Sequence, residues 1–371
     1  MKTFALYHRT LAYRWLIQQS GWIVFGFSAL MMAMMLGSRG LNEPDEGRYA
    51  SVAVEMLRSG DWLTPRFEGH AHLTKPPLTY WLMAGSMRLL GINEGAARLP
   101  SALAGLGCIL LTWSMARRWH HVRVSLLAAI MLLFSPLFFV MARVADPNML
   151  LTFFVTLAVW SWLRYQDREG VVFRWVFYIA LGLAMLTKGP VVLILVGLPV
   201  FFMARARRCI GDSPATWSWA GALLAIGMGF GWHIWMVMGD SSLAGYFVGE
   251  EVLARVAGTS HHRNEPAWFY IPVILGGFLP WLVFLWFGLL DIRRNSSVHT
   301  LVTRPLAVAL ACEVVFFTLV RSKLPTYVLP MFPWLALIAA PAITSPGMSR
   351  RARWVGFLLP LAIAVVAPGI A

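Results

Sequence analysis

The sequence is poor in charged residues and in cysteine. Of its 371 residues, 13% are Asp, Glu, Lys or Arg, about half the share of an ordinary soluble domain, whereas 58% are apolar. So few charged residues are not enough to cover the surface of a water-soluble protein of this length. The three cysteines, Cys108, Cys209 and Cys312, lie far apart, so we expect no disulfide framework. A glycine-rich phosphate loop, a serine nucleophile elbow and a Cys-x-x-Cys pair are also missing.

Apolar runs of membrane-spanning length recur along the whole chain. A hydrocarbon core of about 30 Å needs about 20 apolar residues in a helix. The runs therefore predict an all-α polytopic membrane protein of about eleven transmembrane helices in one domain, 1–371, rather than an outer-membrane barrel. The shorter stretch 77–91 is expected to lie at the membrane interface. The expected spans are 19–38, 97–116, 124–142, 147–163, 174–187, 190–204, 217–238, 268–290, 305–320, 326–343 and 354–371.

The basic residues predict the orientation. With a cytoplasmic N-terminus, each of six inner segments carries three Lys or Arg residues, the first of them Lys2, Arg9 and Arg14, so nearly all of the +14 net charge falls on the inner side. This is the positive-inside pattern of a cytoplasmic (inner) membrane protein, and it also attracts anionic lipid. No basic patch is interleaved with stacking aromatics, so nucleic acid is not an expected partner.

The outer side carries charges of both signs. They concentrate in a first outer loop, 39–96, and a second large outer loop, 239–267. Mixed charge on one side of a polytopic protein indicates a polar site at that membrane face, with solvated loop ends as the alternative. A helix from about Pro44 to Arg58 places Asp45, Arg48 and Tyr49 on one face, at i, i+3 and i+4, while Glu46 points elsewhere. Plain helix capping by the two acids is the competing interpretation.

Lysine next to proline occurs twice on the outer side. Lys75 precedes two prolines that fix the backbone and start the next helix, and Lys323 lies before Pro325 at the start of a span. Each lysine suits a phosphate as a point cation, but each is also explained as a lysine that snorkels to the interface.

Other polar residues have simple structural explanations. Asp146 precedes Pro147 and can cap the following helix, and Lys188-Gly189-Pro190 can be a tight turn. The pair His261-His262 lacks the spacing that places two metal ligands on one helix face. Glu313 lies in the middle of a span, where an ionised carboxylate is costly, so we expect it to be protonated or to face the bundle interior.

Taken in order, the outer-face motifs resemble a known enzyme family. The similar segments are Asp45-Glu46-Gly47-Arg48-Tyr49-Ala50, Ser59-Gly60-Asp61-Trp62, Lys75-Pro76-Pro77, Val144-Ala145-Asp146-Pro147, Leu186-Thr187-Lys188-Gly189, Glu250-Glu251, His262-Arg263, Leu279-Pro280-Trp281 and Ser322-Lys323-Leu324-Pro325-Thr326-Tyr327. They resemble the lipid A aminoarabinose transferases and the related protein O-mannosyltransferases, which are polyprenyl-phosphate-sugar-dependent glycosyltransferases of the GT-C class. The resemblance covers about residues 40 to 345.

The resemblance implies a fold and a reaction. The fold is a GT-C bundle with interfacial helices in the first outer loop, without the C-terminal soluble domain of longer relatives. The reaction moves a sugar, with inversion, from a polyprenyl-phosphate donor to a lipid or protein acceptor at the periplasmic face of the inner membrane. The residues implied to bind the lipid phosphate are Lys75, Arg48, Arg263, Lys323 and Tyr327, and the implied catalytic acids are Asp45, Asp146 and, at lower odds, Glu46.

A metal is implied only weakly. Metal-binding relatives carry an acid just before the lysine of Lys75-Pro76, and Thr74 stands there in this chain. A divalent metal is therefore possible but doubtful, with His262 as its candidate ligand and His70, His72 and His261 as substitutes.

Two other functions remain open at this point. Within the same enzyme class, protein O-mannosylation is the alternative to glycolipid or lipid A modification. In a different class, a transporter or lipid flippase is compatible with many spans and the lone Glu313, and it predicts inverted repeats and a midplane site.

Overall fold

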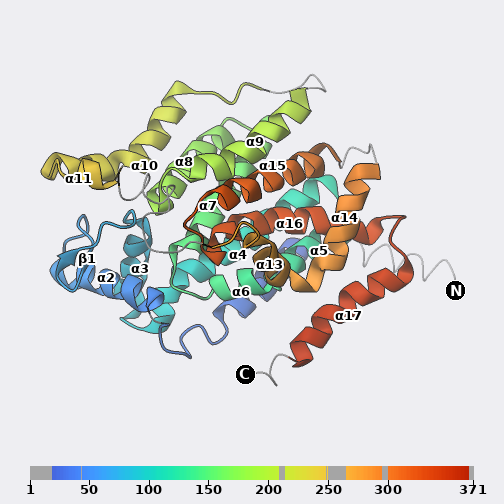
Figure 1. The fold of residues 1–371 in the computed structure, drawn as a ribbon, viewed down its shortest axis with the longest axis horizontal. Coiled ribbons are helices and arrows are strands. Elements are labelled where there is room, and N and C mark those ends of the chain that lie inside the picture. Colours follow the sequence, from blue (N-terminus) through green and yellow to red (C-terminus); the bar gives the residue numbers. More distant parts are fainter. Residues whose placement is uncertain are drawn as a thin grey trace.

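The computed structural model describes residues 19–42, 44–208, 214–247, 249, 265–294 and 300–366. The described part is almost entirely helical, which confirms the all-α prediction (Figure 1). After a first helix over Gln19–Ala33, the elements are α2 (Asp45–Ser59), β1 (Arg66–Phe67), β2 (His70–Ala71), α3 (Leu78–Leu90), α4 (Glu94–Trp119), α5 (Val122–Leu133), α6 (Pro136–Met141), α7 (Pro147–Gln166), α8 (Val172–Lys188), α9 (Val192–Arg208), α10 (Trp219–Gly239), α11 (Leu243–Gly245), α13 (Tyr270–Gly277), η2 (Leu279–Trp281), α14 (Leu282–Arg294), α15 (Thr300–Leu319), η3 (Pro325–Met331), α16 (Phe332–Ala339), η4 (Ala340–Thr344) and α17 (Arg350–Val366).

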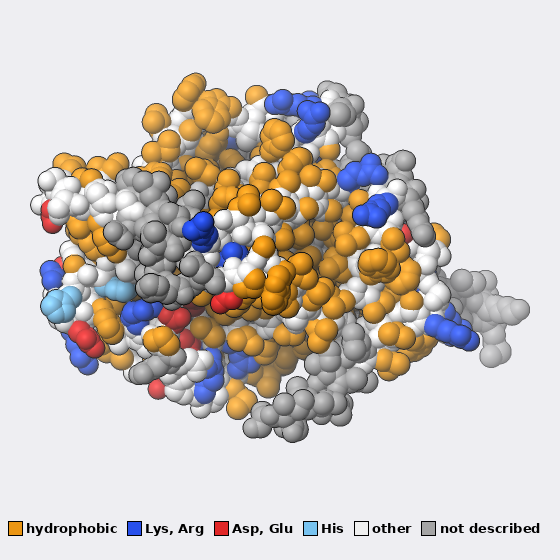
Figure 2. Space-filling view, in the orientation of Figure 1, with side chains coloured by type: hydrophobic (Ala, Val, Ile, Leu, Met, Phe, Trp, Pro, Cys, Tyr) orange, Lys and Arg blue, Asp and Glu red, His pale blue; other side chains and the backbone are white. Residues whose placement is uncertain are grey.

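Several of these helices suit a membrane. Among the described residues, four are long and apolar enough to cross one, Glu94–Trp119, Trp219–Gly239, Val302–Leu319 and Pro325–Thr344, and a bent pair makes up to five. The space-filling view shows hydrophobic side chains over the middle of the molecule, with charges of both signs and histidines at the left (Figure 2). The polytopic membrane fold is therefore confirmed, whereas the number of eleven spans stays a prediction.

Two expected spans are interrupted by proline. The run 124–142 is divided into α5 and α6 at Phe134-Ser135, because Pro136 has no N–H to continue the helical hydrogen bonds. The run 268–290 bends by 75° between Tyr270–Gly277 and Leu279–Arg293, where Pro280 follows a pair of glycines. Periodicity of apolar residues does not reveal such breaks, so both spans were expected as single helices.

The first outer loop folds as a small subdomain at one end of the bundle. Helix α2 ends at Gly60, which adopts a φ of +73°, and α3 is the interfacial helix expected at 77–91. The two helices share a buried apolar cluster with the start of α4: Tyr49, Val52, Ala53, Met56, Tyr80, Met83, Ala84, Met87, Ala96 and Ala97. Tyr49, which the sequence places on one face of α2 with Asp45 and Arg48, lies in this cluster, whereas the Asp45 side chain is 58% exposed.

A β-hairpin in this loop was not foreseen. Strands β1 and β2 pair Arg66 with Ala71 and Phe67 with His70. The two turn residues, Glu68 and Gly69, both have positive φ, as the tight hairpin turns that match strand twist require. Glutamate is uncommon at such a position. The Glu55 carboxylate accepts the Gly69 N–H at 3.2 Å, which fixes the turn to α2.

A buried ion pair ties the first outer loop to the bundle. Arg98 and Glu46 are each 1% exposed, and Arg98 Nε donates to Glu46 Oε1 at 2.8 Å. The guanidinium also donates to Glu46 Oε2 at 3.0 Å and to the carbonyl oxygens of Leu36, Arg39 and Gly40 at 2.7–3.0 Å. Every donor that an arginine has is thus used. The pair joins the end of the first helix, the start of α2 and the start of α4.

Removing one member of this pair should destabilise the whole protein. We expect Arg98→Ala to lower the free energy of unfolding by about 3–5 kcal/mol, because a buried carboxylate is left without its partner. Arg88→Ala, which removes an exposed arginine from α3, should cost less than about 0.5 kcal/mol. Thermal unfolding of the purified variants in one detergent measures both.

A double-mutant cycle separates the pair from its surroundings. Glu46→Gln combined with Arg98→Gln should cost clearly less than the sum of the single changes, since neither charge is then stranded. Strictly additive costs would mean that the two side chains do not act together.

Candidate functional site

A cavity of about 410 Å³ lies where the first outer loop meets the bundle. Four stretches that are distant in the sequence line it: the loop with α2, the turn before α7, the end of α8 and the segment before α16. The lining residues are Asn42, Asp45, Glu46, Arg48, Tyr49, His72, Thr74, Lys75, Met141, Val144, Asp146, Pro147, Asn148, Lys188, Ser322, Leu324, Pro325, Thr326 and Tyr327. The candidate acids and three of the five candidate phosphate ligands are thus brought together.

Helix α2 contributes one acidic side chain, Asp45, and one cationic side chain, Arg48, to the cavity. Arg48 and Asp45 form an ion pair one turn apart, and the Asp45 side chain is 58% exposed. The guanidinium of Arg48 lies 5.7 Å from the centre of the Tyr49 ring. Because Asp45 is open to water and one turn of helix away, Arg48 can exchange this partner for an anion in the cavity at little cost.

The loop between the hairpin and α3 contributes a second cationic side chain, Lys75. Lys75 is half-buried, and its ammonium donates to its neighbour's carbonyl, Thr74 O, at 2.9 Å. Pro77, two residues later, is the N-cap residue of α3. His72 lies 3.0 Å from the Thr74 hydroxyl. Burial, and then the positive charges of Arg48 and Lys75, lower the pKa of His72 to about 4, so the imidazole is neutral at pH 7.

The turn before α7 supplies the second acid. Asp146 caps α7, as expected, and its Oδ1 accepts the Asn148 N–H at 2.7 Å. Its carboxylate also accepts from the Asn148 side-chain amide. Burial raises the pKa of Asp146 above its ordinary value, while Lys188 and the bonds from Asn148 oppose that rise. A carboxylate in this position holds a proton more readily than a surface aspartate does.

Lys188 is a cavity residue that the sequence placed in a family-like segment and a tight turn but not among the candidate phosphate ligands. Its ammonium donates to Asn148 Oδ1 and lies 4.3 Å from the centre of the Tyr327 ring. It is the last residue of α8, where the helix dipole favours a cation. The predicted topology could have indicated this role, because it places Lys188 at the outer end of a span, on the same side as Asp146 and Lys75.

Glu46 has a different environment from the other two acids. Besides its bonds with Arg98, it accepts the Asn42 N–H at 2.9 Å and the Ala145 N–H at 2.8 Å. Burial raises its pKa, but the hydrogen bonds from Arg98 and these two amides outweigh burial and hold the pKa below its ordinary value. The carboxylate is therefore charged and fully engaged. These contacts favour a positioning role rather than the catalytic role expected for Glu46.

The remaining candidates fall in two groups. Lys323 is buried and donates to Glu265 O at 3.0 Å, so it anchors the segment whose neighbours, from Ser322 to Tyr327, line the cavity. It is not itself a lining residue. Arg263 and His262 lie outside the described residues, so their predicted roles stay predictions.

The possible metal site and the buried Glu313 are two further features that the sequence raised. Within the described ranges, no three His, Cys, Asp or Glu side chains are grouped as a metal site requires. Glu313 is completely buried in α15, and neither carboxylate oxygen has a hydrogen-bond partner among the described residues. It does not line the cavity.

Comparisons with known proteins identify relatives of this chain. Residues 74–235 match the family described as dolichyl-phosphate-mannose-protein mannosyltransferase. An undecaprenyl phosphate-alpha-4-amino-4-deoxy-L-arabinose arabinosyl transferase of Pseudomonas fluorescens is 30% identical over 347 residues, which cover 90% of this chain and 61% of that protein. An uncharacterized protein of Aquifex aeolicus is 31% identical over 85% of this chain and 62% of its own length.

A solved structure extends the similarity to the fold. The crystal structure of ArnT from Cupriavidus metallidurans bound to undecaprenyl phosphate matches with a TM-score of 0.80 and 29% identity, over 94% of this chain and 64% of that one. The chain spans less than two thirds of the length of these three relatives. In both sequence and fold, the comparisons confirm the resemblance to the GT-C superfamily of the aminoarabinose transferases and protein mannosyltransferases.

Proposed function

We propose that the protein transfers a sugar from a polyprenyl-phosphate donor to a lipid acceptor of the lipid A type, with inversion at the sugar. The observation that carries the proposal is the convergence of Arg48, Lys75, Lys188, Asp45 and Asp146 on one cavity of about 410 Å³. Side chains of both charge signs gathered in one cavity suit a phosphate-linked sugar, since the cations can bind its phosphate and the carboxylates can bind hydroxyl groups.

The cations fit the leaving group. As the bond between the anomeric carbon and the phosphate oxygen breaks, negative charge grows on the polyprenyl phosphate. Lys75 and Arg48, held in place before the reaction, stabilise that charge most effectively in a partly buried site. Lys188 and the Tyr327 hydroxyl add a further cation and a donor to the cavity lining.

The carboxylates of Asp146 and Asp45 suit the activation and positioning of the acceptor. In an inverting transfer the acceptor oxygen attacks the anomeric carbon from the face opposite the phosphate, and its proton must go to a base. Asp146 suits this role, because burial raises its pKa and so its affinity for a proton. Asp45, paired with Arg48, orients the sugar and the guanidinium. If the acceptor is itself a phosphate, no base is required, and both carboxylates position groups.

The sidedness of the reaction follows from the basic residues. Helix α7 runs from Pro147 in the cavity to a last turn that carries Arg164, and α8 runs back from a first turn that carries Arg174 to Lys188 in the cavity, so the cavity lies opposite these inner arginines. By the positive-inside rule the N-terminus is cytoplasmic and the cavity faces the periplasm. The expected partners are the polyprenyl-phosphate sugar, the acceptor lipid and the surrounding membrane lipids.

Protein mannosylation is the second candidate, favoured by the family match over residues 74–235. Mass spectrometry of outer-membrane lipids and of secreted proteins from a deletion strain separates the two. Loss of a sugar from the lipids alone supports our proposal, and loss from the proteins alone supports the second candidate.

Lys75→Gln should lower sugar transfer in membranes by at least about 100-fold, because a charge that stabilises the leaving phosphate is lost. Arg58→Gln is the matched control, since it removes an exposed cation from α2 outside the cavity. Transfer of radiolabelled sugar at equal expression measures both. Full activity of Lys75→Gln would remove the lysine from the mechanism.

Asp146→Asn tests the base without removing the helix cap. The asparagine oxygen still accepts the Asn148 N–H, so thermal stability should change little. The rate of transfer to a hydroxyl acceptor should fall by about 10²–10⁴-fold. An unchanged rate at saturating donor would show that Asp146 is not the base for that acceptor.

His72 generates a prediction about pH. Its pKa of about 4 in the folded protein lies below the value of about 6.5 for an unfolded histidine, so protonation favours unfolding. The stability that neutral His72 provides is complete above pH 6.5 and is lost as the pH falls towards 4. The melting temperature of the wild type should therefore fall more between pH 7 and 4.5 than that of His72→Gln. Parallel curves would contradict the lowered pKa.

A further inference from the structure

Asn148 joins a candidate acid to a cation in the 410 Å³ cavity. It lies in the first turn of α7, directly after Pro147, and is 4% exposed. Its Nδ2 donates to Asp146 Oδ1, and its Oδ1 accepts from the Lys188 ammonium. The function proposed above uses the acid and the cation but gives Asn148 no part.

The two partners determine which way the Asn148 amide points. An ammonium can only donate and an ionised carboxylate can only accept, so the amide oxygen must face Lys188 and the amide nitrogen must face Asp146. An aspartate at this position would offer no donor, and a leucine would offer neither group. Because a buried amide is costly unless its polar groups are bonded, the start of α7 is fixed to the end of α8.

The same arrangement holds one oxygen of Asp146 and leaves the other available. Oδ1 accepts the Asn148 backbone N–H at 2.7 Å as well as the side-chain amide. Within the described residues Oδ2 accepts no hydrogen bond, and it is not sealed from the cavity. Both oxygens of Glu46, by contrast, bond to Arg98. A base needs the arrangement found at Asp146, with one oxygen held in place and the other able to receive a proton.

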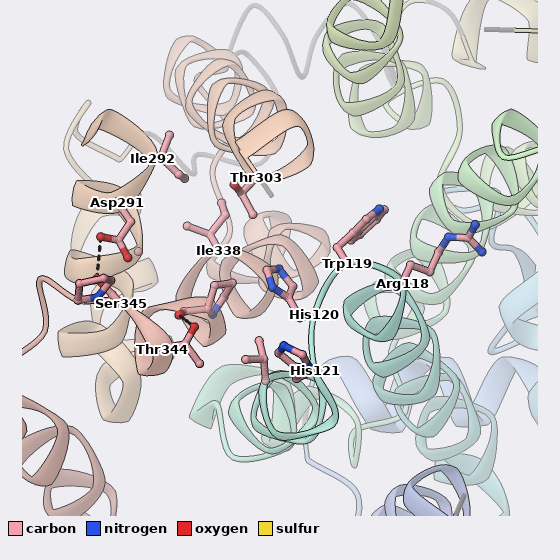
Figure 3. A pocket seen from close by; sticks show the side chains of 14 residues that line it. Arg118, Trp119, His120, His121, Asp291, Ile292, Thr303, Ile338, Thr344 and Ser345 are labelled. Atoms are coloured by element: carbon pink, nitrogen blue, oxygen red, sulfur yellow. Dashed lines mark hydrogen bonds between the residues drawn. The ribbon is translucent and has the colours of Figure 1, made fainter. Parts of the chain in front are cut away.

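An acid in another cavity of the bundle is held differently. Asp291 lines a second cavity, of about 650 Å³, and accepts a hydrogen bond from the Ser345 hydroxyl at 2.7 Å (Figure 3). The described lining of that cavity includes neither a lysine nor an asparagine. The chain of lysine, amide and carboxylate therefore belongs to the first cavity and is not a general feature of the polar cavities in this protein.

We propose that Asn148 is a positioning residue for sugar transfer: its amide, held by Lys188, fixes Asp146 so that Oδ2 meets the acceptor. The inference rests on the function proposed above, with a hydroxyl acceptor. In that step an electron pair of the acceptor oxygen forms the bond to the anomeric carbon, and the hydroxyl proton passes to Asp146 Oδ2. The bond from the anomeric carbon to the phosphate oxygen breaks, and its electron pair leaves with the polyprenyl phosphate. Asn148 itself exchanges no proton.

Two variants of similar side-chain size isolate the amide. Asn148→Leu removes both amide groups without adding a charge, and Asn148→Gln supplies an amide again. Both keep the backbone N–H that bonds to Asp146, so α7 keeps its cap. Sugar transfer is measured in membranes at equal expression. The probe is radiolabelled undecaprenyl phosphate-4-amino-4-deoxy-L-arabinose, the donor for which the Pseudomonas fluorescens relative is named.

Asn148→Leu should lower kcat by about 10–100-fold, because a base displaced by about 1 Å no longer meets the acceptor proton. The KM for the donor should stay within about twofold of the wild-type value, since Lys75 and Arg48 bond to other partners. Asn148→Gln should recover part of the lost kcat. A merely structural role predicts no such separation of kcat from KM.

Thr152→Val is the matched control. Thr152 is completely buried one turn further along α7, and its hydroxyl donates to the Asn148 carbonyl oxygen at 2.8 Å. It does not line the cavity. This variant should lower the melting temperature, as Asn148→Leu does, but should leave kcat unchanged.

The outcomes separate this inference from the function on which it rests. Wild-type kcat in Asn148→Leu, beside a defective Asp146→Asn, would overturn the positioning role alone. A raised KM with unchanged kcat, or an equal loss of kcat in Thr152→Val, would also overturn it. Absence of transfer by the wild type would count against the proposed function itself, and the inference would fall with it.

Discussion

The buried pair of Glu46 and Arg98 determines where the cavity residues lie. Glu46 adjoins Asp45 in the sequence, and the Ala145 N–H that it accepts belongs to the residue before Asp146. One carboxylate therefore holds the start of α2 beside the start of α7, with one candidate acid next to each contact. Arg98 in turn ties this carboxylate to the end of the first helix. Glu46 thus fixes the backbone next to Asp45 and Asp146, the two acids that we propose take part in the reaction.

The same arrangement explains why opposite charges coexist in the cavity. Asp45 with Arg48, and Asp146 with Asn148 and Lys188, form two local groups that come from different parts of the chain. Each cation is held near an acid or amide, so it is oriented before any ligand binds, and a phosphate needs only to replace or join those partners. Such preorganisation is what a reaction with a charged leaving group requires. His72 stays neutral at pH 7 and does not add to this balance.

Much of the fold follows from simple patterns. The spacing of Asp45, Arg48 and Tyr49 predicted one face of α2, and the two prolines after Lys75 predicted where α3 begins. The capping role of Asp146 followed from the proline after it. These features depend on neighbours within a few residues, which the sequence shows directly.

Features that depend on distant partners were not predictable in the same way. The partner of Glu46 lies 52 residues away on another helix, and nothing near Glu46 distinguishes a buried acid from a helix-capping one. Lys188 likewise joins the site through Asn148, 40 residues earlier. The resemblance to the transferases brought Lys323 in as a phosphate ligand, but its neighbours line the cavity while its own ammonium holds Glu265 O.

The most direct test of the account is a structure of the protein in a lipid nanodisc with a polyprenyl phosphate bound. We expect the phosphate in the 410 Å³ cavity, with its oxygens at hydrogen-bond distance, about 3 Å, from Lys75 Nζ and the Arg48 guanidinium. Asp146 should remain in the cavity lining, where it can meet an acceptor. A phosphate bound elsewhere on the bundle, with this cavity empty of the lipid headgroup, would contradict the central claim.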